Sequence, residues 1–365
     1  MKIIFIIDSL CSGGAERVMS VLANNLSDTG YQITILSKVH QPGFYELSEN
    51  VRLVYPKTEI NYKNAITTAF SRMDLYVDIY KYLKNAKPDL VIPFSTTTNG
   101  TVIILCKLLG LKVIASEHNN FRLNLKSFPI WFIKRHIYPH ANLITVLTER
   151  DKNEYYSKFM KNVVVMPNPL PLVPIEKVNL HQRDKIILSA GNLSRWEQKG
   201  FDCLLEIFLQ ITPKYPQWKL CIAGNGDSAY LTELITKLEL NNRVSLLGEI
   251  KDIQNIMQRS SIFAMTSRWE GLPMVLLEAM SQGMACIAFD CFTGPGDLIT
   301  NGSDGILIED KNIDQFVVGL SKLIEDQDLR LTLGTNAIEN SKKYLPAKIV
   351  ERWLSMIENS IAYYE

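Results

Sequence analysis

The sequence lacks the features that would mark a membrane-spanning or nucleic-acid-binding protein. It has no stretch of about 18 consecutive apolar residues, so no segment is predicted to cross a bilayer. The apolar run Ile3–Ile7 is too short for a signal peptide and ends at Asp8 without a small-residue cleavage pattern. The formal net charge is only +1, so no overall field would attract a nucleic acid. We therefore expect a cytoplasmic protein without a nucleic-acid partner.

Metal-binding patterns are also missing. The six cysteines form no Cys-x-x-Cys pair, and the five histidines form no cluster with zinc spacing. Asp326-Gln327-Asp328 has the letters of an Asp-x-Asp metal motif, but it lies in a polar stretch between a helix and a turn. We predict reduced thiols, no bound metal and no cofactor.

What the sequence does contain is a regular alternation of strand-like and helical patterns. Continuous apolar runs are typical of parallel strands that are buried on both faces and separated by helices. After the first run, Val18, Leu22 and Leu26 recur every four residues, which predicts an amphipathic helix. The apolar runs lie at residues 3–7, 33–36, 90–93, 112–115, 143–147 and 163–166, and then at 186–190, 220–223, 244–247, 262–266, 285–289 and 305–308.

A proline-rich stretch separates the two series of runs. Four prolines fall between residues 167 and 174, where neither a helix nor a central strand can continue. We predict an α/β fold of two doubly wound, Rossmann-like parallel-sheet domains, residues 1–167 and 185–345, which face a central cleft. Residues 168–184 would be the hinge. Residues 346–365 would form a last helix, which we expect to pack back on the first domain.

In doubly wound sheets, ligands bind beyond the carboxyl ends of the strands. The strongest pattern in such a position runs from Glu270 to Glu278. Pro273 suits the first turn of a helix, so Glu270 would precede the helix and Glu278 would lie inside it. The amides of Gly271 and Leu272 would then offer an anion site. In the alternative interpretation, Glu270 caps the helix and Glu278 is solvated.

Three further loops follow predicted strands. The loop from Gly191 to Gly200 carries Arg195 and Lys199, cations that suit a diphosphate but could equally be ordinary surface charges. The pair Gly13-Gly14 would let a backbone approach a ligand at a helix N-terminus, or would simply form a tight turn. His118 follows the run 112–115, where either a ligand contact or a structural role fits.

A rival hypothesis comes from residues 224–229. Gly224-Asn225-Gly226-Asp227-Ser228-Ala229 matches the dinucleotide fingerprint G-x-G-x-x-A, which would make the protein an NAD-dependent dehydrogenase. The match follows the second predicted strand of its domain rather than the first, and Glu249 is not clearly placed to bind a ribose. We therefore favour the site at Glu270 and Glu278.

Together these motifs resemble the retaining glycosyltransferases of family 4, which have the GT-B fold, over essentially the whole chain. The Glu-x7-Glu pair is similar to the family's donor site, and His118 to its active-site histidine. The pair Gly13-Gly14 resembles the glycine-rich first loop, and Lys199-Gly200 the end of the cationic loop. One position departs: the family usually has arginine directly after the first glycine of the cationic loop, where this chain has Asn192.

The resemblance implies metal-independent transfer of a hexose or N-acetylhexosamine, with retention, from a UDP-sugar to a lipid-linked or glycan acceptor in bacterial surface-polysaccharide or lipopolysaccharide biosynthesis. It gives the diphosphate to Arg195 and Lys199 with nearby glycine amides, the donor-sugar hydroxyls to Glu270 and the ribose to Glu278. His118 would lie near the anomeric carbon. A catalytically silent nucleotide-sugar-binding subunit and a GT-B epimerase are the alternatives.

Residues 121–138 combine cations with aromatic side chains, a composition typical of segments that lie on an anionic membrane. We predict a reversible membrane contact, so that the protein would be peripheral on the inner face of the membrane. Charge reversal at Lys134 and Arg135 should weaken it. In the alternative interpretation, this is an ordinary amphipathic helix with Trp131 in the core. The residues concerned are Arg122, Lys126, Lys134 and Arg135, with Phe128, Trp131, Phe132 and Tyr138.

Overall fold

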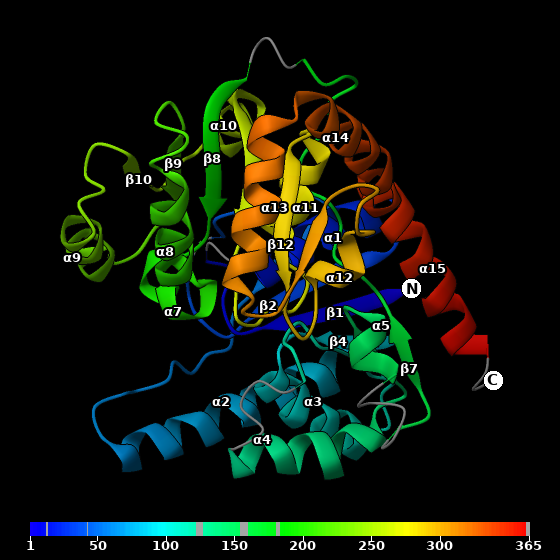
Figure 1. Ribbon diagram of the computed structural model, residues 1–365. Coiled ribbons are helices and arrows are strands. Elements are labelled where there is room, and N and C mark those ends of the chain that lie inside the picture. Colours follow the sequence, from blue (N-terminus) through cyan, green and yellow to red (C-terminus); the bar gives the residue numbers. More distant parts are fainter. Residues whose placement is uncertain (12–13, 42, 122–126, 154–159, 180–182, 363–365) are drawn as a thin grey trace. The chain divides into compact units, whose positions relative to one another are not determined.

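The computed structural model describes the chain except for residues 12–13, 42, 122–126, 154–159, 180–182 and 363–365 (Figure 1). The chain divides into two compact units. Unit 1 comprises Met1–Pro169 and Pro346–Glu365, and unit 2 comprises Leu170–Leu345. Each unit is a parallel β-sheet with helices, and each is described separately below.

The sheet of unit 1 is built from two groups of parallel strands. The first has the order β3-β2-β1-β4 and the second the order β5-β6-β7. Single parallel bridges from Val91 to Val113 and from Phe94 to Ser116 connect β4 to the second group. The strands are β1 (Lys2–Ile7), β2 (Gln32–Ser37), β3 (Val51–Val54), β4 (Leu90–Pro93), β5 (Ile114–Ser116), β6 (Leu143–Val146) and β7 (Val163–Val165).

The helices of unit 1 bury the apolar faces that their periodicity predicts. Val18, Leu22 and Leu26 of α1 are buried in one cluster with β1. Ile349 and Trp353 of α15 lie in the same cluster, although they are remote in sequence. The helices are α1 (Gly14–Asp28), α2 (Ala65–Ala86), α3 (Thr96–Leu109), α4 (Phe128–Phe132), the π-helix η1 (Ile133–Ile137), the 3-10 helix η2 (Tyr138–His140), α5 (Glu149–Asp151) and α15 (Pro346–Ala362).

The sheet of unit 2 is parallel and has the order β10-β9-β8-β11-β12-β13. The strand order reverses between β8 and β11, and such switch points are where doubly wound folds bind ligands. The strands are β8 (Asp184–Ala190), β9 (Lys219–Ala223), β10 (Val244–Gly248), β11 (Ser260–Met265), β12 (Ala285–Asp290) and β13 (Ile306–Glu309).

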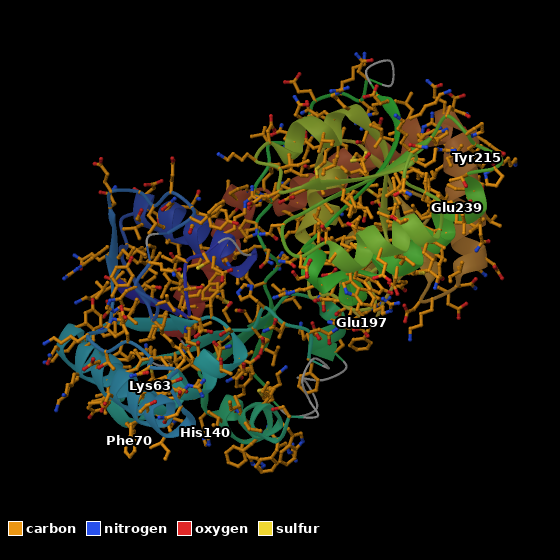
Figure 2. The ribbon with its side chains drawn as sticks, turned by 90° about the vertical axis from the view of Figure 1, so that its left-hand side faces the viewer. Lys63, Phe70, His140, Glu197, Tyr215 and Glu239 are labelled. Atoms are coloured by element: carbon orange, nitrogen blue, oxygen red, sulfur yellow. The ribbon has the colours of Figure 1, made fainter. Side chains whose placement is uncertain are left out.

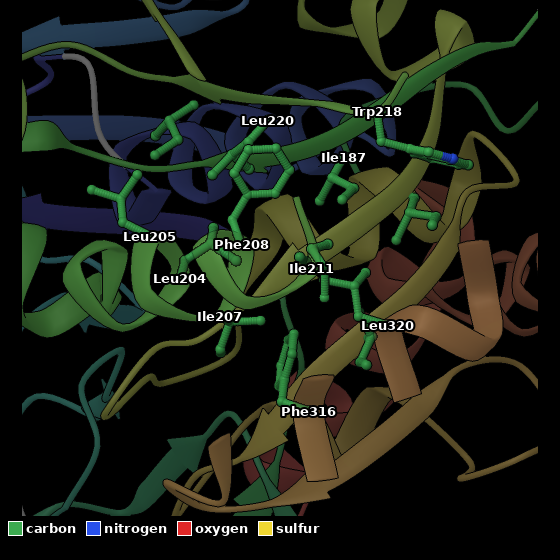
Figure 3. Packing of buried hydrophobic residues seen from close by; sticks show 14 of the residues in the cluster. Ile187, Leu204, Leu205, Ile207, Phe208, Ile211, Trp218, Leu220, Phe316 and Leu320 are labelled. Carbon is green, nitrogen blue, oxygen red and sulfur yellow. The ribbon is translucent and has the colours of Figure 1, made fainter. Parts of the chain in front are cut away.

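A large apolar cluster packs on one side of this sheet. Phe208 of α8 and Phe316 of α13 pack with Ile187 and Leu220 of the strands (Figure 3). The helices are η5 (Leu193–Arg195), α7 (Trp196–Lys199), α8 (Phe201–Ile211), α9 (Ala229–Lys237), α10 (Ile253–Arg259), α11 (Met274–Ser281), α12 (Pro295–Leu298), α13 (Ile313–Glu325), α14 (Gln327–Ser341) and η6 (Lys342–Tyr344).

Each apolar run predicted from the sequence overlaps a strand, but β3 was not predicted. Its four residues include the exposed Arg52, so it has no continuous apolar run. Asp326 is the N-cap of α14 and accepts a hydrogen bond from the amide of Leu329, which explains its place without a metal. The six cysteines are free. Among the described residues, none of the helices is long and apolar enough to cross a bilayer.

Candidate functional site

The acidic and cationic motifs of unit 2 meet beyond the carboxyl ends of β8 and β11. Lys199 is the last residue of α7, and Glu270 lies in the loop between β11 and α11. Their side chains form an ion pair, with Nζ of Lys199 2.8 Å from Oε1 of Glu270. Glu270 is buried and the lysine side chain is mostly buried. Two motifs that are 71 residues apart in sequence therefore form one polar centre.

Glycines make the room that this pair needs. A Cβ at Gly191 would lie 3.0 Å from Cε of Lys199, so the missing side chain lets the lysine cross the end of β8. Gly200 has φ +64°, and a Cβ there would lie 1.9 Å from the carbonyl oxygen of Thr266. Only glycine combines that conformation with that approach. The turn from α7 into α8 therefore depends on Gly200.

The backbone around Glu270 is also fixed. Thr293 donates its hydroxyl to the carbonyl oxygen of Glu270 at 2.6 Å. A Cβ at Gly294 would lie 2.5 Å from the carbonyl oxygen of Gly271, so the loop after β12 packs directly on the loop before α11. These contacts hold residues 270–271 in one conformation at the start of the helix.

The alternative interpretation of the two glutamates is wrong. The N-cap of α11 is Pro273, so Glu270 is not the capping residue. Glu278 lies inside the helix but is buried, with 6% of its surface exposed, so it is not a solvated helix residue. Buried carboxylates are unusual unless they are paired. Glu270 therefore lies before the helix in an ion pair, and Glu278 lies inside the helix in a buried position.

Asn192 has a local structural role. Its side-chain oxygen accepts from the amide of Ser194 at 2.9 Å, and its amide group donates to Oδ1 of Asn225 at 3.0 Å. It therefore caps η5 and ties the loop after β8 to the loop after β9. Arg195, the last residue of η5, is exposed.

The same packing explains the glycines of the dinucleotide-like stretch. A Cβ at Gly224 would lie 1.8 Å from the carbonyl oxygen of Gly191. The amide of Leu193 donates to the carbonyl oxygen of Asn225 at 2.7 Å. The loops after β8 and β9 thus touch through their backbones, and Gly224 is needed for that contact whatever ligand is bound.

In unit 1, His118 lies just beyond the carboxyl end of β5. Its Nε2 is 2.9 Å from the hydroxyl of Ser116, and its ring stacks on Phe94 with the centroids 4.6 Å apart. Burial lowers the pKa of His118 to about 4, while Glu117 and Asn168 act in the opposite direction. The imidazole is therefore neutral at pH 7. Asn168 acts on this pKa through a side-chain contact, but among the described residues Nδ1 makes no hydrogen bond of normal geometry.

The glycines predicted near the first strand are only partly described. Gly14 is the first residue of α1 and is exposed, and Gly13 lies outside the described residues. Asp8 follows β1 directly, and Nζ of Lys38 lies 2.8 Å from its Oδ1. Burial alone would raise the pKa of Asp8, but Lys38 and hydroxyl donors bring it below its usual value. A negative charge is thus fixed at the end of β1.

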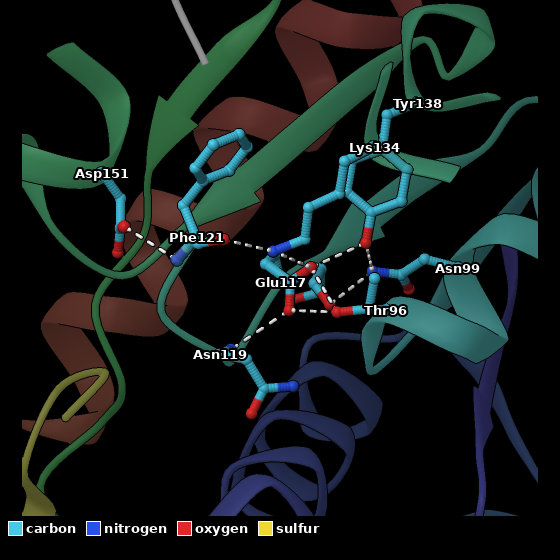
Figure 4. Close-up of polar contacts among 9 residues, drawn as sticks. Thr96, Asn99, Glu117, Asn119, Phe121, Lys134, Tyr138 and Asp151 are labelled. Atoms are coloured by element: carbon cyan, nitrogen blue, oxygen red, sulfur yellow. Dashed lines mark hydrogen bonds and ion pairs between the residues drawn. The ribbon is translucent and has the colours of Figure 1, made fainter. Parts of the chain in front are cut away.

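Beside His118 lies a buried polar network that sequence reasoning missed (Figure 4). At its centre is Glu117, whose Oε2 accepts from the hydroxyl of Tyr138 at 2.7 Å and from that of Thr96 at 2.8 Å. Nζ of Lys134 lies 4.0 Å from the same oxygen. The only sequence signal for this network is a glutamate placed between a strand and a histidine.

This network corrects the prediction for residues 121–138. Lys134 is 3% exposed and Tyr138 is fully buried, because both hold Glu117. Charge reversal at Lys134 would therefore disrupt this buried network and would not test a membrane-facing surface. Trp131 is 43% exposed, so it does not lie in the core either. Arg122 and Lys126 lie outside the described residues.

Comparisons with known proteins find relatives along the whole chain. Residues 12–172 match the family described as Glycosyltransferase Family 4, and residues 173–340 match Glycosyl transferases group 1. The amylovoran biosynthesis glycosyltransferase AmsD of Erwinia amylovora is 31% identical, over 96% of this chain and 98% of that protein.

One further relative is named for its acceptor, and one solved structure with a similar fold contains a nucleotide. A Campylobacter jejuni GalNAc-alpha-(1->4)-GalNAc-alpha-(1->3)-diNAcBac-PP-undecaprenol alpha-1,4-N-acetyl-D-galactosaminyltransferase is 30% identical over 98% of both chains. Among solved structures, Anabaena HepE in complex with UDP superposes with a TM-score of 0.79 at 19% identity, over 98% of this chain and 100% of that one.

Proposed function

Because the chain belongs to glycosyltransferase family 4 and has the GT-B fold, we propose that it transfers a hexose or N-acetylhexosamine from a UDP-sugar to a lipid-linked or glycan acceptor, with retention of anomeric configuration. The reaction would serve the assembly of a bacterial surface polysaccharide or lipopolysaccharide. Two relatives support this choice, since one is named for an undecaprenol-linked acceptor and the other for amylovoran biosynthesis. A solved structure with a similar fold was crystallised with UDP.

The observation that carries the proposal is the ion pair between Lys199 and Glu270. A nucleotide-sugar presents a diphosphate next to sugar hydroxyls, so its site needs a cation beside a hydrogen-bond acceptor. Nζ of Lys199 and Oε1 of Glu270 are 2.8 Å apart at the edge where a parallel sheet binds ligands. We assign the diphosphate to Lys199, the sugar hydroxyls to Glu270 and the ribose to the buried Glu278.

Cationic side chains and amides would stabilise the leaving group. When the bond between the anomeric carbon and the phosphate oxygen breaks, negative charge develops on the diphosphate. Preorganised cations and amides aimed at such charge are usually the largest catalytic contribution. Lys199 and the exposed Arg195 would supply the cations, and the amides of Gly14, Gly271 and Leu272 would assist. Gly191 contributes by leaving room for Lys199. No protein nucleophile is assigned.

His118 would act as a neutral hydrogen-bonding group. Its low pKa keeps it uncharged at pH 7, and in the described part of the chain Nδ1 makes no hydrogen bond of normal geometry. A neutral imidazole can donate or accept at that nitrogen, according to its tautomer. We place it near the anomeric carbon, where it would hold a hydroxyl of the donor or the acceptor.

The experiment is a turnover assay with a panel of nucleotide-sugars and an undecaprenyl-diphosphate-linked saccharide. Release of UDP that depends on the acceptor is expected for one donor, with an α-linkage in the product by NMR. Activity should persist in excess chelator, because the cations are side chains. Loss of activity in chelator, with recovery on adding magnesium or manganese, would overturn the assignment to side chains.

The same assay separates the alternatives. A catalytically silent subunit would bind a nucleotide-sugar but release no nucleotide with any acceptor. An epimerase would turn over a nucleotide-sugar without an acceptor. Both are less well supported, because Glu270, Glu278 and Lys199 are all present and two of them are paired.

We also propose that unit 1 contacts an anionic membrane reversibly, through α4 and α2. Phe128, Trp131 and Phe132 of α4 are exposed. On α2 the exposed apolar residues recur along one face of the helix, opposite the buried Leu75 and Ile79. Figure 1 draws both helices on the same side of unit 1, and Figure 2 labels Phe70 at the outer side of α2. The apolar stripe on α2 consists of Ile66, Phe70, Met73 and Val77.

A sedimentation assay with liposomes of phosphatidylglycerol and phosphatidylcholine tests this contact. A Phe128→Ala, Phe70→Ala double variant should bind at least about tenfold more weakly, since burying one such ring contributes roughly 1.5–3 kcal/mol. The matched control is Val318→Ala, an exposed apolar residue of unit 2. Arg135→Glu should weaken binding at low salt. Equal binding of all variants would leave a soluble acceptor as the better account.

A further inference from the structure

Glu117 is almost completely buried, although it is the residue directly before His118. Its side chain is 1% exposed, and a buried carboxylate is costly unless hydrogen bonds compensate for the lost water. The compensation here comes from four directions: two hydroxyls, one ammonium group and one backbone amide (Figure 4). Each of these partners, all in the described part of the chain, is a donor or a cation.

One of those donors belongs to the turn that carries His118. Oε1 of Glu117 accepts from the backbone amide of Asn119 at 3.1 Å. On the other side of the histidine, the carbonyl oxygen of Ser116 accepts from Nδ2 of Asn99 at 3.0 Å. The backbone of Glu117 itself donates to the carbonyl oxygen of Thr145 at 2.9 Å. His118 therefore lies between two backbone positions that buried side chains hold.

We propose that Glu117 is a positioning residue for His118: its carboxylate fixes the turn 117–119 and so aims the imidazole at a hydroxyl of the bound sugar. This inference rests on the role proposed above for His118. Thr96, Lys134 and Tyr138 hold the carboxylate in place from α3, η1 and η2. Glu117 itself does not contact the sugar.

The chemistry of the pocket requires a carboxylate rather than an amide. An ionised carboxylate only accepts hydrogen bonds, whereas glutamine has one accepting oxygen and one donating nitrogen. In Glu117→Gln, the new NH2 group must face either the amide of Asn119 or the hydroxyls of Thr96 and Tyr138. Beside Asn119, the NH2 group opposes a backbone amide and removes the contact that holds the turn. On the other side, it opposes the ammonium group of Lys134, and the two hydroxyls lose the oxygen to which they donate. The turn would shift, although the size of the side chain is unchanged.

The test is a double-mutant cycle between Glu117→Gln and His118→Ala, measured as kcat and KM in the turnover assay. We expect Glu117→Gln to lower kcat on the order of 10- to 100-fold with little change in KM, because small misplacements of a reacting geometry have effects of that size. In the His118→Ala background, the same change should cost less than about threefold, since no imidazole remains to be aimed. The matched control is Glu149→Gln. The side chain of Glu149, in the same unit, is 60% exposed, so this variant should leave kcat unchanged.

A second readout separates positioning from a general loss of structure. The negative charge of Glu117 raises the pKa of His118. Glu117→Gln should therefore lower this pKa further, which NMR of labelled histidine can follow. Equal losses in the wild-type and His118→Ala backgrounds would overturn the proposal, even if both variants are less active. If Glu117→Gln does not fold, Tyr138→Phe replaces it in the cycle, and additivity there overturns the proposal equally.

The cycle also distinguishes this inference from the proposed function. A slow His118→Ala variant together with a wild-type-like Glu117→Gln variant removes only the positioning role. Full turnover by His118→Ala removes the role of His118 and the positioning role together. Absence of turnover in the wild-type protein with every donor contradicts glycosyl transfer itself.

Discussion

The two units present polar residues at the carboxyl ends of their strands in different ways. In unit 2, the ion pair between Lys199 and Glu270 lies where loop backbones pack closely against one another at glycines. In unit 1, His118 follows Glu117, and the carboxylate of Glu117 contacts side chains from three helices. The first centre joins two recognisable motifs, and the second is dispersed over several segments.

The difference concerns how a site is supported. Glycine contacts can be recognised in the sequence, because glycines at fixed positions in a loop form part of a motif. A hydrogen-bond network leaves almost none, because Thr96, Lys134 and Tyr138 are ordinary residues until the fold brings them to one carboxylate. Substitutions should therefore act differently in the two units, and the following predictions test that difference.

The largest effect is expected in unit 1, from Trp353→Ala in α15. Trp353 is 2% exposed in the cluster that contains β1 and α1, and truncation of such a residue costs about 3–5 kcal/mol. Denaturant unfolding followed by circular dichroism measures the loss. Trp131→Ala is the matched control, because this tryptophan is substantially exposed, and it should cost less than about 1 kcal/mol. Equal costs would contradict the placement of α15 in the core of unit 1.

Next comes the ion pair of unit 2. Lys199→Ala and Glu270→Ala should each lower turnover on the order of a hundredfold or more, comparable with the loss of one oxyanion contact. Both residues lie at the edge of the sheet rather than in the apolar core, so the variants should fold. Lys237→Ala, at an exposed position in α9, serves as the control. Near-normal turnover of either folded variant would remove that residue from the donor site.

A smaller effect should distinguish two glycines of unit 2. Gly200 and Gly248 have similar φ values of +64° and +67°, but only Gly200 would bring a Cβ within contact distance of a neighbour. Alanine at Gly248 should cost about 1–2 kcal/mol from the left-handed conformation alone. Alanine at Gly200 should cost clearly more and should also reduce turnover, because it moves Lys199. Equal unfolding midpoints for the two variants would contradict the close approach to Thr266.

The smallest effect is the pH dependence due to His118. Its pKa is about 4 in the folded protein and near 6.5 when unfolded, so the unfolded chain binds the extra proton between these values. The stability that the neutral imidazole contributes is therefore present above pH 6.5 and is lost as the pH falls toward 4. His118→Gln should lose less stability than wild type between pH 7 and pH 5 in denaturant titrations. Identical losses would show that His118 titrates normally.

Much of the fold could be predicted from local patterns. Buried parallel strands read as continuous apolar runs, so the runs in both units were found, and the GT-B fold is confirmed. The strand β3 was missed because it is short and carries Arg52. The acidic motif was found because Pro273 marks the start of α11. Lys134 was misplaced because a lysine between aromatic residues in a helix gives the same pattern whether it faces solvent or a buried carboxylate.

The sequence by itself determined the class of the protein, because family motifs and apolar periodicity depend only on the order of residues along the chain. Only the tertiary structure decided which charges lie inside. Glu117 and Lys134 are both buried because strand and helix ends distant in sequence converge around them, and Lys199 meets Glu270 for the same reason. Burial and pairing depend on neighbours in space, and a linear pattern of residue types does not specify those neighbours.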